Sequence, residues 1–419
     1  MKVIRIAIPA LVVFAVLAYG AVEPWSVAIL EAGSALLLVL WVLTEAGAGQ
    51  IELRSNPLIW AAGGLVVLAL LQWAGGLTVY GYATKLAAMQ LFAEWILLFL
   101  TIQAFRTPRQ WKRLVWFLMI LAFAVSLFAI VQYFTWNGKL YWIQPLQHGG
   151  QAFGPFVDRD DFAGFAELIL PLGLALLLFD GERQERRLLV GLFVVFPAAA
   201  LLLSSSRAGV VCFLFELFLL GILTGMLGRR SQRWLLAGMV VAILALAVWL
   251  GVGYTVQRFI QGNGTEMSLI SRLEMSRDTL HIFLDHPLLG TGMGTFETAY
   301  PRYQTHSVGL IVNHAHNDYV ELLSDGGIVA GIFGLAFLVI LYRHGIRNLR
   351  RARTPLTRSL YAGGLVACTG LLTHELVDFN LHIPSNAIIF LVIAALTTAV
   401  IPEPIAKPRH GVFHPNLPS

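Results

Sequence analysis

The sequence contains few charged residues. Asp, Glu, Lys and Arg together make up 13% of the 419 residues, whereas hydrophobic residues make up 57%. Soluble domains carry about 25% charged residues, so this chain has too little charge for a water-facing surface of ordinary composition. The composition therefore excludes an ordinary soluble globular protein and predicts an integral membrane protein.

Cysteine is also scarce, and common metal and nucleotide motifs are missing. The two cysteines, Cys212 and Cys368, fall inside apolar stretches, so a disulfide framework is not expected. No HExxH motif occurs, and the histidines at 314 and 316 have no cysteine beside them, which disfavours a zinc site there. The glycine-rich segment 286–296 lacks the Lys-Ser/Thr ending of a P-loop, so we interpret it as a turn-forming loop.

Long apolar runs occupy most of the chain. A membrane-crossing helix needs about 20 residues. We predict twelve spans, near residues 6–22, 27–45, 57–75, 87–105, 114–134, 161–180, 188–204, 208–228, 234–253, 326–342, 359–378 and 386–402. The first is interpreted as a span and not as a signal peptide, because a second apolar run follows it.

The predicted fold class is an all-α integral membrane protein, with one polytopic domain over residues 1–419. A large loop, 254–325, lies between spans nine and ten, and we expect the proline-rich tail, 403–419, to be disordered inside the cell. With the N-terminus inside, most of the 29 Lys and Arg residues fall on the inner side, as the positive-inside rule requires. The basic net charge is thereby explained, and no nucleic-acid partner is implied.

Four polar segments fall on the predicted outer side: 151–167, 204–209, the long loop with 268–296 and 313–319, and 374–387. Polar residues gathered at one membrane face are typical of a site that faces a cavity. Arg207 lies in a very short turn between two spans, where its guanidinium either reaches lipid headgroups or binds phosphate oxygens.

Residues 269–285 have apolar side chains at helical spacing, which predicts an amphipathic helix on the membrane surface. Arg272 and Arg277 would lie on or beside its polar face. For Arg277 in particular, an ordinary solvated position is the simpler interpretation.

The segment NHAHNDYVELLSDGG, residues 313–327, allows three interpretations. The apolar part of the next span, 328–342, is only about 22 Å long as a helix, so the helix is expected to begin earlier, with His316 at the outer interface. The segment is then a zinc site, a helix start capped by Asn317, or the position of a general base, because histidine titrates near neutral pH. A histidine with two arginines on one face would suit departure of a diphosphate.

Five blocks of the sequence resemble the O-antigen ligase and polymerase superfamily of bacterial membrane glycosyltransferases. His316-Asn317, nine residues and Gly327 resemble its His-Asn…Gly-x-x-Gly pattern, although Ala330 stands at the last position and Gly331 one later. The other blocks are SSSRAG (204–209), a long-loop block (271–296), a block at 154–171 with Asp158 and Asp161 where asparagine is usual, and DFNLHIP (378–384).

The resemblance implies a GT-C-like fold in the bacterial inner membrane, with the site facing the periplasm. It implies metal-independent, inverting transfer from an undecaprenyl-diphosphate-linked glycan, without a cofactor. We favour lipid A–core as the acceptor, as in a ligase; a second lipid-linked glycan, as in a polymerase, is the alternative. By position, His316 would be the base, and Arg207 and Arg272 would bind the diphosphate. The expected supporting residues are His314, Asn317, Asp318, Arg159, Arg277, Asp378 and His382.

A transporter or flippase for glycolipids is the alternative from another class. Glu31, Glu94, Glu167 and Glu216 fall within predicted spans, where carboxyl groups can relay protons. However, no inverted repeat is evident, and the polar segments lie on one face, whereas alternating access uses a midplane site.

Overall fold

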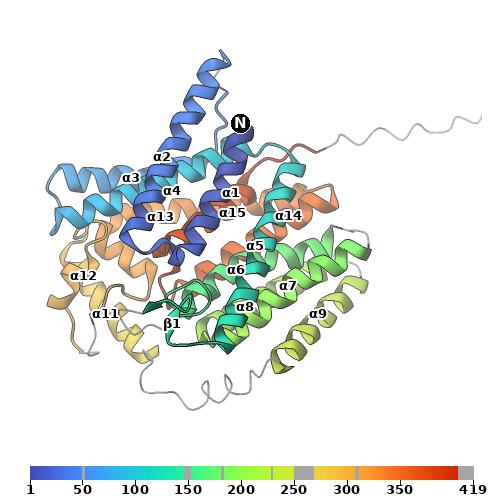
Figure 1. The fold of residues 1–419 in the computed structure, drawn as a ribbon. Helices are drawn as coiled ribbons and strands as arrows, with labels where there is room; N and C mark the ends of the chain where they lie inside the picture. Colours follow the sequence, from blue (N-terminus) through green and yellow to red (C-terminus); the bar gives the residue numbers. More distant parts are fainter. Residues whose placement is uncertain are drawn as a thin grey trace, which may run out of the picture.

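The computed structural model describes residues 1–49, 52–145, 152–180, 184–227, 230–249, 269–306 and 311–403. Most of these residues are helical (Figure 1). The α-helices are α1 Lys2–Leu17, α2 Pro24–Gly47, α3 Pro57–Ala74, α4 Gly81–Ala104, α5 Pro108–Phe134, α6 Arg159–Phe179, α7 Gln184–Ser204, α8 Arg207–Leu227, α9 Arg230–Trp249, α11 Leu269–Asp285, α12 Phe296–Ala299, α13 Asp318–Arg351, α14 Pro355–His374 and α15 Pro384–Thr398.

Short elements complete the described part. They are the 3-10 turns η1 Tyr19–Ala21, η2 Tyr300–Arg302 and η3 Asn380–His382, and the strands β1 Lys139–Leu140 and β2 Gln144–Pro145, which pair antiparallel. Within the described ranges, nine helices are long and apolar enough to cross a bilayer: α2 to α9 and α13. The protein is therefore an integral membrane protein, as predicted.

The three other predicted spans coincide with α1, α14 and α15, so the count of twelve stays a prediction. Much of the predicted loop, 254–268 and 307–310, and the predicted tail from residue 404 lie outside the described residues.

Several helix starts follow from local chemistry. The side chain of Asn56 accepts a hydrogen bond from the backbone N–H of Leu58, and Thr107 forms a capping box with Gln110. In both cases proline occupies the first helical position, where its missing N–H is not needed. The chain therefore turns into α3 and α5 at defined residues.

Helix α6 lies at the centre of the molecule and is packed by α5, α7, α8, α14 and α15 (Figure 1). Its apolar, membrane-crossing segment is buried along its whole length. A Cβ added at Gly363 of α14 would lie 2.9 Å from the Cα of Leu172 of α6, so the glycine permits the two helices to approach closely. Because α6 is so enclosed, the polar residues at its N-terminal end are held firmly against the segment that follows α14.

Helix α13 begins at Asp318, as predicted, and the side chain of Asn317 accepts hydrogen bonds from the next two free backbone N–H groups. The predicted cap is therefore confirmed. Within α13, Gly327 has φ +60° and interrupts the helix, a feature that the predicted span does not include. A Cβ at Gly327 would collide with the carbonyl group of Leu288, so only glycine suits this position.

The glycine-rich loop 286–295 fills the break in α13. The backbone N–H of Ile328 donates to the carbonyl of Pro287 at 2.8 Å, and the N–H of Thr291 donates to the carbonyl of Ser324 at 2.9 Å. The loop thus satisfies backbone groups on both sides of the break. It follows directly after α11, which also packs against α13, so the segment that carries Arg272 is fixed to the helix that follows His316.

Candidate functional site

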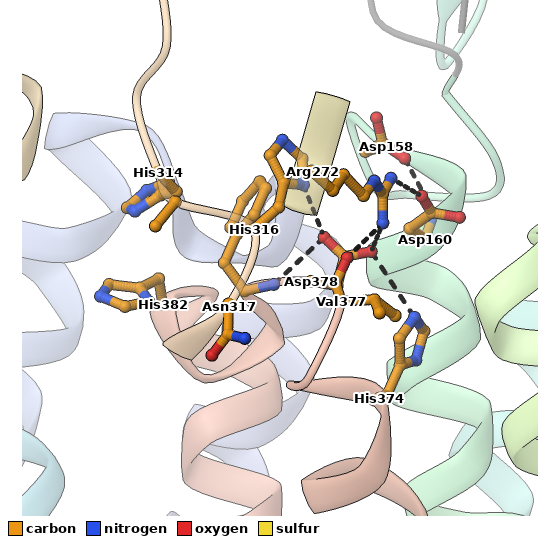
Figure 2. A network of polar contacts seen from close by, with 12 residues as sticks. Asp158, Asp160, Arg272, His314, His316, Asn317, His374, Val377, Asp378 and His382 are labelled. Carbon is orange, nitrogen blue, oxygen red and sulfur yellow. Dashed lines mark hydrogen bonds and ion pairs between the residues drawn. The ribbon is translucent and has the colours of Figure 1, made fainter. Parts of the chain in front are cut away.

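The residues just before α13 are bound to the segment that follows α14. The side-chain amide of Asn317 donates to the carbonyl of Leu376 at 3.0 Å, and the backbone N–H of Asp318 donates to the carbonyl of Glu375 at 3.1 Å. His316 has φ +48°, an unusual conformation for a residue with a side chain. The strained backbone turns its ring toward Asp378 (Figure 2).

Asp378 is the centre of the network in Figure 2. Its Oδ1 lies 3.2 Å from Nδ1 of His316, and its Oδ2 lies 3.4 Å from Nη1 of Arg272 and 3.5 Å from Nε2 of His374. Burial alone would raise the pKa of Asp378. Hydrogen bonds from His316 and His374 and the charge of Arg272 outweigh burial and hold this pKa well below its usual range. Asp378 is therefore ionised at neutral pH.

An ionised Asp378 determines how His316 can act. A carboxylate only accepts hydrogen bonds, so the Nδ1 of His316 carries the hydrogen of this contact, and in the neutral imidazole the Nε2 has the lone pair. The His316 side chain is 17% exposed, which leaves it accessible from outside the protein. The pair has the arrangement of a general base oriented by a carboxylate.

Arg272, from α11, lies between two carboxylates. Its Nη2 is 3.2 Å from Oδ2 of Asp160, and Nη1 also donates to the carbonyl of Val377 at 2.5 Å. Burial would lower the pKa of Arg272, but Asp378 and Asp160 raise it. The neighbouring Asp158 caps α6 by accepting from the backbone N–H of Asp160 at 2.8 Å. Burial, followed by the charge of Asp160, raises the pKa of Asp158 to about 7.

The network continues into the membrane interior. Nδ1 of His374 lies 3.1 Å from Oε2 of Glu167 in α6, and both side chains are fully buried. The carboxylate oxygens of Glu216 in α8, which are also buried, have no hydrogen-bond partner among the described residues. Glu94 is bonded by Gln90 at 3.1 Å. Glu167 and Glu94 are therefore held by polar neighbours, whereas the buried Glu216 has no hydrogen-bond partner among the described residues.

Arg207 is exposed at the first residue of α8, directly after Ser205 and Ser206. The hydroxyl of Ser206 accepts from the backbone N–H of Gly209 at 3.0 Å, and a Cβ at Gly209 would lie 2.5 Å from the Cβ of Ala163 in α6. Serine and glycine of this hairpin are therefore explained by a helix start and by close packing. Helix α8 packs against α6 and α14, whose ends carry Asp160 and His374.

Arg159 is buried at the N-terminus of α6 and lines a cavity of about 350 Å³. The cavity lies between the ends of α5 and α7 and the start of α6. It is lined by Ala129, Gln132, Tyr133, Trp136, Ala152, Phe153, Gly154, Arg159, Leu203, Ser204 and Ser205. Its position connects the hairpin of Arg207 with the segment that holds Asp160. Arg277, in contrast, is exposed on α11 and has no hydrogen bond or ion pair recorded within the described ranges.

A second polar cluster lies beside the first. Nδ1 of His314 is 2.8 Å from Oε1 of Glu321, and His382 is 2.8 Å from Asp318 through Nδ1 and 3.3 Å from Glu321 through Nε2. Burial would lower the pKa of His382, but Glu321 and Asp318 raise it to about 10. His314 therefore belongs to this second cluster.

Phe379 separates the two clusters. Its ring stacks on His314 at a centroid distance of 4.5 Å and meets His316 edge-on at 4.8 Å. The two histidines of the NHAHN segment thus have different partners. Asp160, Glu321, His374 and Phe379 are members of the clusters that the sequence patterns do not single out. The spacing of four between His374 and Asp378 is a local signal that places both at one helix end.

The sequence profile of the O-antigen ligase family matches residues 192–335. The matched segment runs from α7 into α13 and includes Arg207, Arg272 and His316, whereas Asp378 and His382 lie outside it. No curated protein matches the chain. The family match confirms the resemblance identified from the sequence. This match supports the O-antigen ligase and polymerase superfamily, whose members are glycosyltransferase-like membrane enzymes.

Proposed function

We propose that the protein is an O-antigen ligase of the bacterial inner membrane. It transfers a glycan from an undecaprenyl-diphosphate donor to a sugar hydroxyl of lipid A–core at the periplasmic face. The observation that carries the proposal is the contact of 3.2 Å between His316 and the ionised Asp378, with Arg272 bound to the same carboxylate. A base and a cation are thereby held next to each other.

His316 acts as the base. Its Nδ1–H is held by Asp378, and its Nε2 takes the proton of the acceptor hydroxyl. The hydroxyl oxygen then bonds to the anomeric carbon of the donor, while the bond from that carbon to the diphosphate oxygen breaks. Attack from the side opposite to the leaving group inverts the anomeric centre. The diphosphate departs on its lipid with the electron pair of the broken bond.

Arg272 and Arg207 stabilise the departing diphosphate. Guanidinium groups bind phosphate oxygens through two parallel N–H donors, and donors placed where negative charge develops lower the barrier. Arg272 exchanges part of its contact with Asp160 for the diphosphate, since both side chains of that ion pair are partly exposed. Arg159 and Asn317 support the site from the cavity wall and the helix start. The reaction uses no cofactor and no metal ion.

The membrane arrangement supports this proposal. Nine helices meet the length and hydropathy requirement of a span, and in the proposed GT-C-like bundle of twelve the helices α1, α14 and α15 are the other three spans. The basic clusters inside and the site segments outside then follow the positive-inside rule.

The first experiment measures glycan transfer by the purified protein in lipid nanodiscs with an undecaprenyl-diphosphate-linked donor and lipid A–core. His316→Ala is expected to lower kcat by about 10²–10⁴-fold. His281→Gln, an exposed histidine on α11, is the matched control and should retain the wild-type rate. Wild-type transfer by His316→Ala would refute the proposed base.

A deletion strain separates the three candidate functions. Loss of polymer from lipid A–core with intact lipid-linked polymer supports the ligase. Accumulation of single lipid-linked repeat units would indicate a polymerase instead. Failure of lipid translocation, with transfer activity absent from the purified protein, would indicate a transporter.

A further inference from the structure

We infer that His314, Glu321 and His382 form a binding site for a divalent transition-metal ion, with Zn²⁺ as the best-suited ion. The three ligand atoms are Nδ1 of His314, Oε1 of Glu321 and Nε2 of His382, and all lie within 4.8 Å of one another. Two imidazoles and one carboxylate are a ligand set that zinc sites use when a fourth position is left for water.

The spacing of these atoms fits one ion. With metal–ligand bonds of about 2.0–2.1 Å, a tetrahedral site separates its ligand atoms by about 3.3 Å. Oε1 of Glu321 lies 2.8 Å from Nδ1 of His314 and 3.3 Å from Nε2 of His382. The two imidazole rings have a centroid distance of 4.5 Å. Small side-chain movements would therefore bring all three atoms around one centre.

Each ligand is oriented by a second contact. Oδ1 of Asp318 holds Nδ1 of His382 at 2.8 Å, and the backbone N–H of Ala315 holds Oε2 of Glu321 at 2.6 Å. The ring of Phe379 stacks on His314. A carboxylate on the far nitrogen of a ligating histidine is the usual outer contact of zinc sites, because it fixes the ring and increases its basicity.

The charge around the cluster also favours a dication. Asp318 and Glu321 are buried carboxyl groups in contact with His382. A proton and a metal ion exclude each other at Nε2 of His382, so the two states are alternatives that a binding experiment distinguishes.

The cluster joins three separate parts of the chain: the strained segment before α13, α13 itself and η3. The side chains of His314 and His382 are 28% and 34% exposed, which gives an ion and a bound water access from outside. A bound ion would hold the segment that carries His316 in place. This inference does not depend on the proposed transfer reaction, because it concerns binding alone.

The test uses the full-length protein in detergent, with any polyhistidine tag removed, after treatment with a chelator and dialysis against Zn²⁺. Elemental analysis is expected to find about one zinc ion per chain, and Co²⁺ in its place should show the strong visible absorption of a tetrahedral site. His314→Ala and His382→Gln should lose the ion. Asp318→Asn, which keeps the ligands, should bind about 10- to 100-fold more weakly.

His281→Gln is the matched control and should bind zinc as the wild type does. Thermal melting of the metal-free proteins identifies variants that fail to fold. If a ligand variant fails to fold, zinc binding is compared between Asp318→Asn and the wild type. Absence of zinc from the wild type, or equal binding by wild type, His314→Ala and His382→Gln, would overturn the inference and indicate an ion pair with a protonated His382. His316→Ala should retain zinc while losing transfer, so failure of the transfer mechanism and failure of the metal site give different results.

Discussion

The imidazole of His316 and the carboxylate of Asp378 lie 3.2 Å apart, although 62 residues separate them in the chain. The contact exists because the start of α13 is hydrogen-bonded to the segment that follows α14. The same carboxylate also contacts Arg272 from α11. One buried acid thus connects the candidate base with a candidate anion-binding residue.

Asp378→Asn should reduce glycan transfer strongly while leaving the shape of the site intact. The amide can donate a hydrogen bond to Nδ1 of His316 and so favour the wrong tautomer, as in serine hydrolases, and kcat is expected to fall by about 10²–10⁴-fold. Steady-state kinetics in nanodiscs with a lipid-linked donor would measure the loss, and His281→Gln is the control. A variant with unchanged kcat would contradict a role for Asp378 in orienting the base.

Arg272→Lys should separate charge from geometry. Lysine keeps the positive charge but cannot contact Asp160, Asp378 and an incoming diphosphate with a planar fork of donors. We expect a lower kcat, because the contact with developing charge is lost, and a smaller change in the KM of the donor. If Arg272→Lys lowered kcat by the same factor with a donor that lacks the diphosphate charge, Arg272 would have only a structural role.

The ionisation of Asp378 should make the fold sensitive to acid. Its pKa in the folded protein is well below the ordinary value of 3.8, so it contributes stability that is present above pH 3.8 and is lost as pH falls through the folded pKa. The difference in melting temperature between wild type and Asp378→Asn should therefore shrink as pH falls below about 4. A constant difference across this range would contradict the ion pairs described for Asp378.

Asp158→Asn should stabilise the protein at neutral and alkaline pH. The pKa of Asp158 is raised to about 7 from 3.8, so folding holds its proton more tightly and its ionisation costs stability as pH rises from 3.8 to 7. Asparagine keeps the cap of α6 without this charge. The melting temperature of the variant relative to wild type should rise between pH 4 and pH 7, measured by differential scanning fluorimetry. A decrease of this melting-temperature difference between pH 4 and pH 7 would contradict the raised pKa of Asp158.

Gly327→Ala should destabilise the docking of the loop 286–295. The φ of +60° and the nearby carbonyl of Leu288 leave no room for a Cβ, and such strain costs about 1–3 kcal/mol. The expected result is a lower melting temperature and faster proteolysis of the loop. Gly221→Ala in α8 is the matched control, because a Cβ there meets nothing within 4 Å. Equal effects of the two substitutions would argue against the docked loop.

Local features of the site can be predicted from the sequence. The Asn317 cap follows from side-chain chemistry within three residues, and the helix at 269–285 follows from apolar periodicity. The apolar side chains Leu269 and Leu273 of this helix are exposed, which agrees with a membrane-facing surface, although lipid contact stays a prediction. Structural features that depend only on residues close in the sequence can thus be predicted without the structure.

Partners that are distant in sequence cannot be predicted in this way. Arg272 and Asp160 are separated by 112 residues, and His382 and Asp318 by 64. These contacts depend on the packing of α6, α13 and α14 against one another, and no local pattern specifies that packing. The same packing gives His314 and His316 different partners, Glu321 and Asp378.

The break in α13 has a mechanical consequence. In an unbroken helix the carbonyl of Ser324 would accept from the N–H of Ile328, but in this protein Thr291 and Pro287 replace these partners. In an apolar surrounding, unpaired backbone groups are costly, so the loop cannot withdraw unless the helix straightens, and the helix cannot straighten unless the loop withdraws. The segment that carries Arg272 and the helix that follows His316 are therefore mechanically coupled. Displacement of one segment is transmitted to the other through these backbone hydrogen bonds.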